Sequence, residues 1–411
     1  MAQLKGACVI AQSGGPTAVI NASFYGAAKA ALDADCVTKV YGAAHGIKGV
    51  LNDVLYDIGQ EDEQELEYLK YTPSSDLGSC RYKMADPDKD DTDYKRILEI
   101  FKKYDVRYFF YNGGNDSMDT CDKISRFMAK SGYECRVMGI PKTIDNDLFG
   151  TDHCPGFASA AKYIATSCME VSRDARVYDT GAVTVMEIMG RHAGWLAASA
   201  ALATHFGDGP DLVYLPETDF DMDEFLTAVE KIYKEKGSAF VAVSEGIHYA
   251  DGRFVSEAVT SATDGFGHAQ LGGLAVKLAE VVKQRLNCKV RGIELSLLQR
   301  CASHCASLTD IEEAALAGRA AVEAAVAGES GYMVAFDCSR ENGYECRTKL
   351  IPLTSVANYE KKIPLEWISD DRCGVKQEFI DYLLPLIQGE PPRVLESSLP
   401  RFAKLKKVQA K

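Results

Sequence analysis

The sequence contains no uncharged apolar stretch of about 18 residues or more, the length that a membrane-spanning helix requires. Its first residues, "MAQLKGACVIAQSGG", enter a strand-like run and show no cleavage-site pattern of a secretory signal. We therefore expect a cytoplasmic protein without a membrane partner.

Basic residues are fewer than acidic ones. The 46 Lys and Arg residues face 59 Asp and Glu residues, which gives a formal net charge of -13. Nucleic-acid phosphates are bound mainly by basic surfaces, so this balance argues against a nucleic-acid partner. An anionic ligand would have to be held by a few locally placed Arg, Lys and backbone N–H groups.

Closely paired cysteines are missing as well. The 13 cysteines form no Cys-x-x-Cys motif, and their number is odd. We expect reduced, partly buried thiols rather than disulfides. The segment "CASHC", with Cys301, His304 and Cys305, lacks a second ligand pair of the usual spacing, which favours a packed helix face over a structural zinc site.

Short apolar runs that end in Gly or acidic residues are abundant, and helical patterns lie between them. The runs are "ACVIAQSGG", "RYFFYNGGNDS", "CRVMGIPKTIDND", "GAVTVMEIMGRHAG", "DLVYLPETD", "AFVAVSEG" and "KVRGIELSLLQR". Near-continuous hydrophobic strands alternating with helices are typical of parallel sheets that are covered on both faces. We therefore predict a doubly wound α/β fold, and the 411 residues allow two or three domains.

Two of these runs end in a pair of glycines. In "AQSGGPTAV", Gly14 and Gly15 precede a helical stretch, where backbone N–H groups could hold a phosphate or could simply form a tight turn. In "YNGGNDSMD", Asp116 or Ser117 could cap the next helix. The oxygen atoms in the same segment are also of the kind that magnesium prefers.

The segment "PKTIDND" brings a lysine and two carboxylates together after a strand. Asp145 or Asp147 could accept a proton from an attacking hydroxyl while the other orients it or binds metal, and Lys142 could neutralise phosphate oxygens. The alternative is a polar turn built around Asn146.

Three later segments add groups suited to a sugar phosphate. Arg191 lies in "MGRHAG", Glu245 in "VSEG", and Arg291 and Arg300 in "RGIELSLLQR". Arginine binds phosphate through two parallel hydrogen bonds, whereas a glutamate suits sugar hydroxyls. Each residue alone could be a surface charge at the end of a strand.

In this order, "SGGPT", "GGNDS", "PKTIDND", "MGRHAGW", "SEG" and "LLQR" resemble the phosphofructokinase family, specifically its pyrophosphate-dependent branch. The resemblance spans roughly residues 5 to 330. It implies two doubly wound, Rossmann-like parallel-sheet domains with the active site in the cleft between them. It also implies reversible, Mg²⁺-dependent transfer of a phosphoryl group from pyrophosphate to the C1 hydroxyl of fructose 6-phosphate, in glycolysis.

The resemblance further divides the chain into three parts. Residues 1–146 with about 290–330 would form the domain for the phosphoryl donor, and residues 147–289 would form the sugar-phosphate domain. Residues 331–411 would be a C-terminal extension that packs on both.

The resemblance also assigns roles to single residues. Asp145 is similar to the family's general base, with Asp147, Lys142 and Asp116 completing the catalytic group. The residues expected to bind fructose 6-phosphate are Thr143, Ile144, Asp145, Met189, Gly190, Arg191, Glu245, Arg291, Leu297 and Arg300. Those expected to bind pyrophosphate are Gly14, Gly15, Arg81 and Lys142. Arg291 matches an arginine that reaches across a subunit interface, which implies a homodimer.

Donor choice rests on two of these positions. ATP-using members commonly have glycine where this sequence has Asp116 and Lys142. A carboxylate at Asp116 would repel the nucleotide α-phosphate, and Lys142 would hold pyrophosphate, which has no nucleoside to anchor it. The alternative function is an ATP-dependent 6-phosphofructokinase of the same fold.

The sequence departs from the family pattern at two positions. Asn115 stands where many members have an aspartate tied to magnesium, so metal binding there would use an amide oxygen. Leu297 stands where ATP-dependent bacterial members have a histidine, so the resemblance implies that only its backbone lies near the sugar phosphate.

Overall fold

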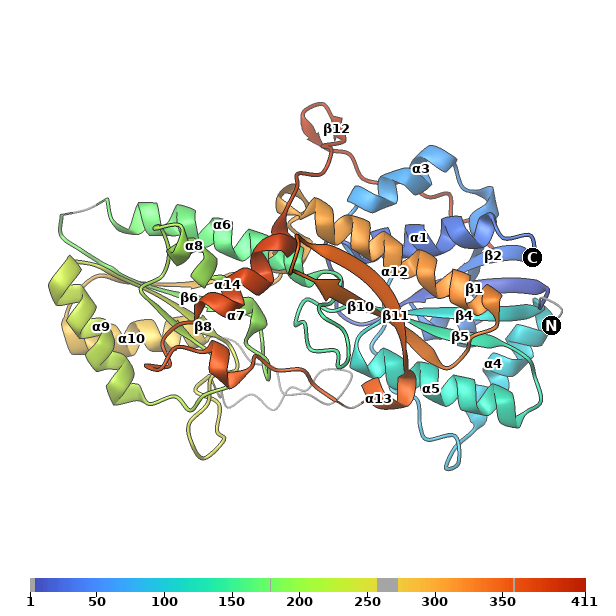
Figure 1. Ribbon diagram of the computed structural model, residues 1–411, viewed down its shortest axis with the longest axis horizontal. Helices are drawn as coiled ribbons and strands as arrows, with labels where there is room; N and C mark the ends of the chain where they lie inside the picture. The colour runs from blue at the N-terminus through green and yellow to red at the C-terminus, as the bar shows by residue number, and fades with distance from the viewer. Residues whose placement is uncertain (1–3, 178, 257–272, 358) are drawn as a thin grey trace.

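The computed structural model describes residues 4–177, 179–256, 273–357 and 359–411. It contains two sheets that lie side by side along the long axis of the molecule (Figure 1). This arrangement confirms the predicted α/β fold with parallel-sheet domains.

The larger sheet has seven strands in the order β11-β10-β5-β4-β1-β2-β3. Their bounds are Gly6–Gln12 for β1, Val37–Ala43 for β2, Leu55–Asp57 for β3, Val106–Gly113 for β4, Arg136–Pro141 for β5, Tyr332–Ser339 for β10 and Glu345–Pro352 for β11. The five central strands run parallel, and β3 and β11 are antiparallel to their neighbours at the two edges.

Strand β1 shows why both faces of this sheet are covered. Val9 packs in a core with helices α4 (Thr92–Lys103) and α5 (Asn115–Lys130), whereas Cys8 and Ile10 pack in a second core with α1 (Ile20–Leu32) and α12 (Leu308–Ala327). Because successive side chains of a strand point to opposite faces, a fully apolar strand needs helices on both sides. Figure 1 shows α1 and α12 on one side of the sheet and α4 and α5 on the other.

The smaller sheet has four parallel strands in the order β7-β8-β6-β9. These are Val183–Ile188 for β6, Leu212–Tyr214 for β7, Ala239–Ser244 for β8 and Val290–Glu294 for β9. One face packs against α6 (Phe157–Ala175), α7 (Trp195–Ser199), α8 (Ala201–His205) and α14 (Gln377–Leu383), and the other against α9 (Met222–Lys236) and α10 (Leu274–Leu286).

The expected return to the first domain near residue 290 is too early. Strand β9, Val290–Glu294, pairs with β6 and therefore belongs to the smaller sheet. The chain returns with α12, which lies against α1. The run "KVRGIELSLLQR" is apolar enough for either sheet, so only its pairing partner decides.

The C-terminal segment contributes to both domains. Strands β10 and β11 complete the larger sheet, while Phe379 and Leu383 of α14 pack in the core of the smaller one. The last residues return to the edge of the larger sheet, where the Asp57 N–H donates to the Val408 carbonyl. Between them, the hairpin of β12 (Leu395–Glu396) and β13 (Leu399–Pro400) projects from the body (Figure 1).

The remaining elements are short. They are α2 (Ile47–Leu51), α3 (Glu63–Tyr68), α11 (Leu298–Cys301), α13 (Leu353–Val356) and the 3₁₀ turns Ile58–Gln60, Leu69–Tyr71, Ser303–Cys305, Leu365–Trp367 and Leu384–Ile387.

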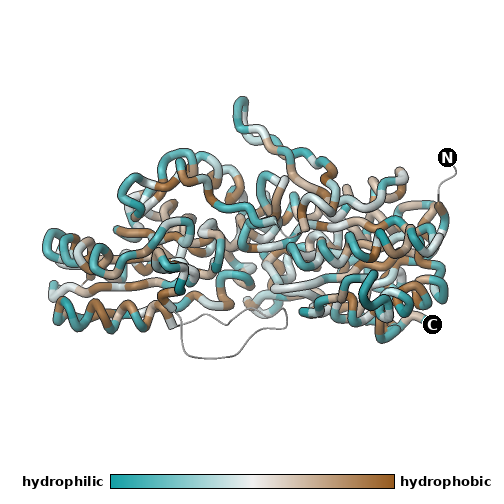
Figure 2. Tube along the Cα trace, turned by 90° about the horizontal axis from the view of Figure 1, so that it is seen from below, coloured by the Kyte–Doolittle hydropathy of each residue, from teal (hydrophilic) through white to brown (hydrophobic). Residues whose placement is uncertain are grey.

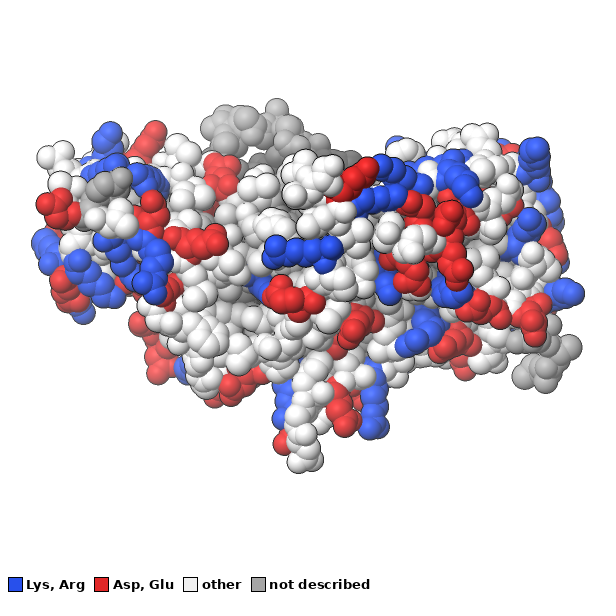
Figure 3. All heavy atoms as spheres, turned by 90° about the horizontal axis from the view of Figure 1, so that it is seen from above, with Lys and Arg blue, Asp and Glu red and all other residues white. Residues whose placement is uncertain are grey.

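Charged side chains of both signs lie on the surface of the molecule (Figure 3). In Figure 3, Lys and Arg side chains lie among Asp and Glu side chains, mainly towards the two ends of the face, and in Figure 2 hydrophobic and hydrophilic stretches alternate along the chain. Within the described ranges, no helix combines the length and the apolar character needed to cross a membrane.

Candidate active site

The glycine loops and the lysine segment follow three neighbouring strands of the larger sheet. After β1, the Ser13 N–H donates to the Asn112 carbonyl of β4 at 2.9 Å, and after β5, the Lys142 N–H donates to the Gly113 carbonyl at 3.1 Å. Parallel strands end at the same edge of a sheet, so three distant segments meet there. The structure thus brings the predicted donor residues together.

The loop of Gly14 and Gly15 is closely surrounded by cations. Lys142 is 3% exposed, and its Nζ donates to the Gly15 carbonyl at 2.7 Å. A Cβ atom at Gly15 would lie 3.2 Å from Nη1 of Arg300. Gly14 has a φ of 77°, a left-handed conformation that glycine adopts without strain. A side chain at either glycine would therefore crowd these cations.

Arg81 reaches the same loop along a separate segment. The Gly14 N–H donates to the Cys80 carbonyl at 3.2 Å, and Ser79 Oγ donates to the Gly14 carbonyl at 2.6 Å. Arg81 is the next residue, and its charge acts on both Lys142 and Arg300. Three cations therefore gather around the first glycine loop.

The start of α5 differs from the predicted cap. Gly114 is the N-cap residue and makes no side-chain capping bond, so neither Asp116 nor Ser117 caps the helix. Asp116 lies in the first turn of the helix, and Asn115 is its first residue. With Gly114 in an extended conformation as the N-cap, the helix begins two residues earlier than a cap at Asp116 predicts and three earlier than a cap at Ser117 predicts.

Asn115 and Asp147 form a hydrogen bond with each other, and each has one side-chain oxygen without a partner among the described residues. Nδ2 of Asn115 donates to Oδ2 of Asp147 at 3.2 Å. Within the described part of the chain, Oδ1 of Asn115 and Oδ1 of Asp147 are buried and have no hydrogen-bond partner. Buried oxygen atoms normally have a partner, so these two are candidates for a ligand that the protein itself does not supply.

The charges of this segment shift one another's ionisation. Burial raises the pKa of Asp145 from its ordinary value of 3.8 to about 7, and the neighbouring charges of Asp147 and Glu245 add to the shift. Burial lowers the pKa of Lys142 to about 8, although Asp145 and Asp147 oppose this change. Burial also raises the pKa of Asp147. Such shifts are frequent at sites that move protons.

Residues of the C-terminal segment form hydrogen bonds with the turn between Asp145 and Asp147. Asn146 has a φ of 55°, and its Nδ2 donates to the Tyr382 hydroxyl at 2.9 Å while its Oδ1 accepts from the Cys154 N–H at 2.9 Å. The Lys361 N–H donates to the Asp147 carbonyl at 2.7 Å. The predicted polar turn exists, and its aspartates face other ionisable groups.

Glu360 is a member of the site that sequence reasoning missed. Residue 360 pairs with Leu148 in an isolated bridge, and its charge raises the pKa of both Asp145 and Asp147, after the larger effect of burial. No motif marks a glutamate more than 200 residues from its partners, so no sequence signal could have found it.

The smaller domain supplies a compact turn after β6. The Gly190 N–H donates to Oε1 of Glu245 at 3.3 Å, and the Met189 N–H donates to Oε1 of Gln299 at 3.3 Å. A Cβ atom on Gly246 would come within 1.8 Å of the Arg191 carbonyl, so glycine is required there. Four predicted sugar-phosphate residues, Met189, Gly190, Arg191 and Glu245, therefore lie together.

Two predicted residues have exposed side chains. Arg291 is on β9, where Nη1 pairs with Asp174 at 3.1 Å, and its side chain is 41% exposed. Leu297 is 54% exposed. Thr143 and Ile144 are buried beside Asp145, as expected from their position.

A cavity of about 580 Å³, lined by residues such as Arg176, Thr204 and Lys236, lies in the smaller domain and contains none of the predicted residues.

The "CASHC" residues do not converge: Cys305 Sγ contacts Thr166, Cys301 Sγ contacts the Leu298 carbonyl, and the His304 ring packs on Tyr163.

Comparison with known proteins agrees with this geometry. A family model described as Phosphofructokinase matches residues 7–325. A protein of Halomonas elongata named pyrophosphate--fructose 6-phosphate 1-phosphotransferase is 46% identical over 401 residues, which cover 97% of this chain and 95% of that protein. A protein of the same name from Methylococcus capsulatus is 45% identical over 96% of this chain and 94% of its own length.

A solved structure gives the same result. The pyrophosphate-dependent phosphofructokinase of Nitrosospira multiformis matches with a TM-score of 0.90 at 40% identity, over 99% of this chain and 98% of that one. Sequence and structure agree over nearly the full length, and the chain belongs to the phosphofructokinase family.

Proposed function

We propose that this chain is a pyrophosphate:D-fructose 6-phosphate 1-phosphotransferase, which transfers a phosphoryl group reversibly to the C1 hydroxyl of the sugar phosphate. The observation that carries the proposal is Lys142, whose buried ammonium group lies on the Gly14–Gly15 loop three residues before Asp145. The names of relatives that are 45–46% identical over nearly the whole chain support the same activity.

Pyrophosphate would lie against the cations of the first glycine loop. Lys142, Arg81 and Arg300 can offset its negative charge, and the backbone at Gly14 and Gly15 leaves room for the phosphate oxygens. Phosphoryl transfer depends mainly on positioning and charge neutralisation, and this loop provides both. Because Arg300 lies next to Gly15, it would act where the donor meets the sugar phosphate.

Asp145 would be the general base that takes the proton of the C1 hydroxyl. Its pKa of about 7 allows it to be deprotonated in the free enzyme near neutral pH and to hold the proton after transfer. Thr143 orients the turn, because its Oγ1 accepts a hydrogen bond from the Asp145 N–H at 3.1 Å.

The residues present fit a magnesium ion. Oδ1 of Asn115 and Oδ1 of Asp147 are buried oxygen atoms without a partner among the described residues, and the two side chains touch. Oxygen is the ligand that Mg²⁺ prefers. When bound, the ion would neutralise charge on the donor phosphates.

Fructose 6-phosphate would lie between this turn and the smaller domain. Arg191 and Glu245 are suited to phosphate and to sugar hydroxyls, and Met189 and Gly190 shape the turn that carries them. Arg291 and Leu297 are exposed, which is compatible with a homodimer in which Arg291 serves the partner subunit. The cysteine usage of the sequence favours a cytoplasmic location.

The donor is tested by measuring fructose 1,6-bisphosphate formation with pyrophosphate and with ATP, in the presence of Mg²⁺. We expect turnover with pyrophosphate and little with ATP, whereas turnover with ATP alone would contradict the proposal. A matched variant is Asp116→Gly, which removes the first-turn carboxylate of α5. It should gain measurable ATP binding, and no change would exclude Asp116 as the residue that rejects ATP.

A further inference from the structure

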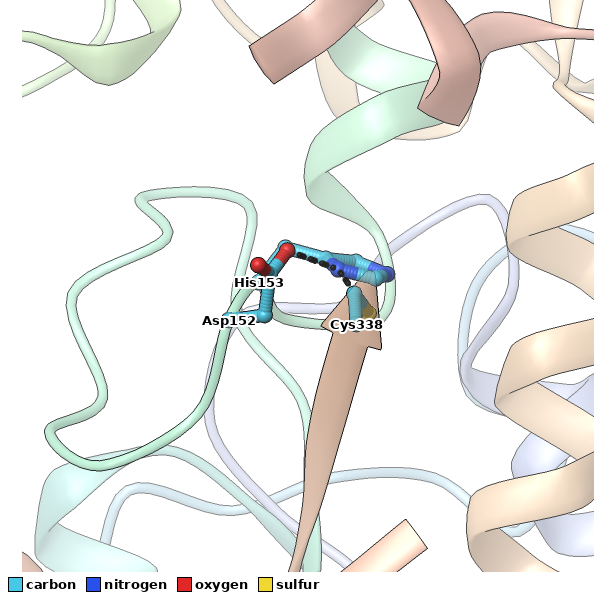
Figure 4. Close-up of side chains that lie close together, drawn as sticks. All are labelled: Asp152, His153 and Cys338. Atoms are coloured by element: carbon cyan, nitrogen blue, oxygen red, sulfur yellow. Dashed lines mark hydrogen bonds and ion pairs between the residues drawn. The ribbon is translucent and has the colours of Figure 1, made fainter. Parts of the chain in front are cut away.

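A second cluster of ionisable side chains lies where β10 and β11 meet the segment before α6. Figure 4 shows Asp152, His153 and Cys338 at its centre. Glu313 of α12 and Arg340 complete the charged groups. The proposed phosphoryl transfer does not use these residues.

Two cysteines of this region face each other across the antiparallel strands. Cys338 of β10 is directly opposite Cys346 of β11 in the register of the sheet. Directly opposed residues have Cα atoms about 4.5–5.5 Å apart, which lies inside the range of about 4.4–6.8 Å that a disulfide spans. Both thiols are partly exposed, whereas Cys8 and Cys168 are buried.

His153 provides a positive charge beside the first thiol. Its Nδ1 lies 3.0 Å from Asp152 Oδ1 and 3.9 Å from Cys338 Sγ, and its Nε2 lies 2.7 Å from Glu313 Oε2. Burial alone would lower the pKa of His153, but its hydrogen bonds to Asp152, Cys338 and Glu313 outweigh this and keep the pKa well above its ordinary value. An imidazolium next to a thiol favours the thiolate.

The ionisation of the two cysteines differs accordingly. A hydrogen bond from Cys346 lowers the pKa of Cys338 to about 6, with His153 assisting against the effect of burial. The same hydrogen bond raises the pKa of Cys346 far above its ordinary value. Cys338 is therefore the nucleophile of the pair, and Cys346 keeps its proton.

The same contacts argue against a metal ion at this place. Both oxygen atoms of Asp152 accept hydrogen bonds from Arg340, at 2.8 and 2.9 Å. Both ring nitrogens of His153 face carboxylates, whereas a metal ligand needs one nitrogen without a proton. Asp152 and His153 are thus engaged in ion pairs.

We propose that Cys338 is an oxidation-sensitive thiol with Cys346 as its resolving partner, so that a hydroperoxide converts the pair into a cross-strand disulfide. The Cys338 thiolate attacks one peroxide oxygen and the O–O bond breaks, which gives a sulfenic acid and hydroxide. Cys346 then loses its proton and attacks the Cys338 sulfur, and hydroxide leaves as the S–S bond forms. In total, two thiols and one hydrogen peroxide give one disulfide and two waters.

The experiment uses the full chain and hydrogen peroxide near equimolar concentration. We expect a loss of about 2 Da in intact mass, since two thiol protons are removed. Trypsin cleaves after Arg340 and Arg347, so the disulfide would link the peptide that ends at Arg340 to residues 341–347. Reduction by a dithiol should separate them.

Three variants make the assignment specific. Cys346→Ser should leave a Cys338 sulfenic acid that dimedone traps, and Cys338→Ser should abolish both products. Cys301, an exposed cysteine of α11, is the matched control, and Cys301→Ser should change nothing. Because an imidazolium lies beside its thiol, Cys338 should react faster with hydrogen peroxide than Cys301 at pH 7.

Several results would overturn the proposal. One is labelling of Cys301 as fast as Cys338, and another is a disulfide that joins either cysteine to a different partner. Stoichiometric binding of Zn²⁺ that is lost in Cys338→Ser would also contradict it and assign a metal site instead.

Discussion

Two neighbouring clusters of buried charge differ in how completely they are paired. In the turn that contains Asp145 and Asp147, burial pushes both carboxyl pKa values upward, and an oxygen of Asp147 has no partner within the described residues. Around Asp152 and His153, a few residues further along, each carboxylate has a cation at hydrogen-bonding distance, and the atom without a partner within the described residues is a nitrogen, Nε of Arg340.

Such a difference is expected between a cluster of charges that a ligand completes and one that the protein pairs by itself. A buried charge costs free energy unless it is paired, so a cluster left incomplete is favoured only where a ligand completes it. Asp152 and Asp145 are both largely removed from water, yet Arg340 and His153 outweigh burial and hold the pKa of Asp152 well below its ordinary value, whereas the pKa of Asp145 is near 7. Pairing, more than burial, distinguishes the two clusters.

The largest expected effect is on catalysis. Asp145→Asn should reduce the rate of phosphoryl transfer by about 10²–10⁴-fold, the usual contribution of a general base. Binding of fructose 6-phosphate, measured by calorimetry, should be kept. A variant that retains a tenth of the activity would exclude Asp145 as the base.

The same variant tests how much the buried carboxylate of Asp145 lowers the unfolding free energy. The folded protein holds a proton on Asp145 up to about pH 7, whereas the ordinary value is 3.8. The unfolding free energy therefore falls as the pH rises through this window, and the loss persists above it. At pH 8, Asp145→Asn should be more stable than the parent by about 1–3 kcal/mol in urea unfolding.

The opposite result is expected when the paired cluster is broken. His153→Leu leaves Asp152 and Glu313 without the cation between them, and loss of one partner from a buried ion pair costs about 3–5 kcal/mol of unfolding free energy. His248 is a suitable control because its ring makes a hydrogen bond with an uncharged group, the Tyr249 carbonyl at 3.1 Å. His248→Leu should cost far less, and equal losses would remove the distinction between the clusters.

The sequence predicted one of these clusters and not the other. "PKTIDND" carries its charges within six residues, so the crowding is visible without a structure. The second cluster joins residues 152–153, 313 and 338–340, which only folding brings together. No motif marks such a set, because each member alone is compatible with a surface position.

The fold shows the same division. All seven apolar runs contain strands, since near-continuous hydrophobic segments identify buried parallel strands. The prediction did not identify β10 and β11 within the C-terminal segment. Exposed and partly buried residues alternate in the edge strand β11, whereas β10 begins with the buried apolar run "YMVAF", a signal of the same kind as the seven that was overlooked. The position of β9 in the smaller sheet was also missed, because pairing partners are set by tertiary contacts.

A smaller effect on catalysis is expected when Lys142, the cation beside Asp145 and Asp147, is replaced. Lys142→Met should raise KM for pyrophosphate by about 10–100-fold, because a hydrogen bond to a charged group contributes about 1.5–3 kcal/mol. KM for fructose 6-phosphate should change less. Steady-state kinetics with each substrate varied in turn distinguishes the two, and equal changes would contradict a role of Lys142 on the donor.

The pH profile tests the ionisation of both groups together. Asp145 must be deprotonated to accept a proton, so kcat/KM should rise with pH through about 7. Lys142 must keep its charge, so kcat/KM should fall as the pH rises through about 8. A bell-shaped profile with its maximum between these values is expected, and a flat profile from pH 6 to 9 would contradict both assignments.

The smallest expected effect concerns Glu360, the partner from the C-terminal segment. Its charge adds to the burial that raises the pKa of Asp145, so Glu360→Gln should move the acidic limb of the profile to lower pH. A distant like charge contributes only a fraction of a pH unit, about 0.2–0.5. Glu366→Gln is the control, because Glu366 is also exposed but lies in the 3₁₀ turn Leu365–Trp367. A limb that does not move, or that moves equally in the control, would show that burial and the near carboxylates alone set the pKa of Asp145.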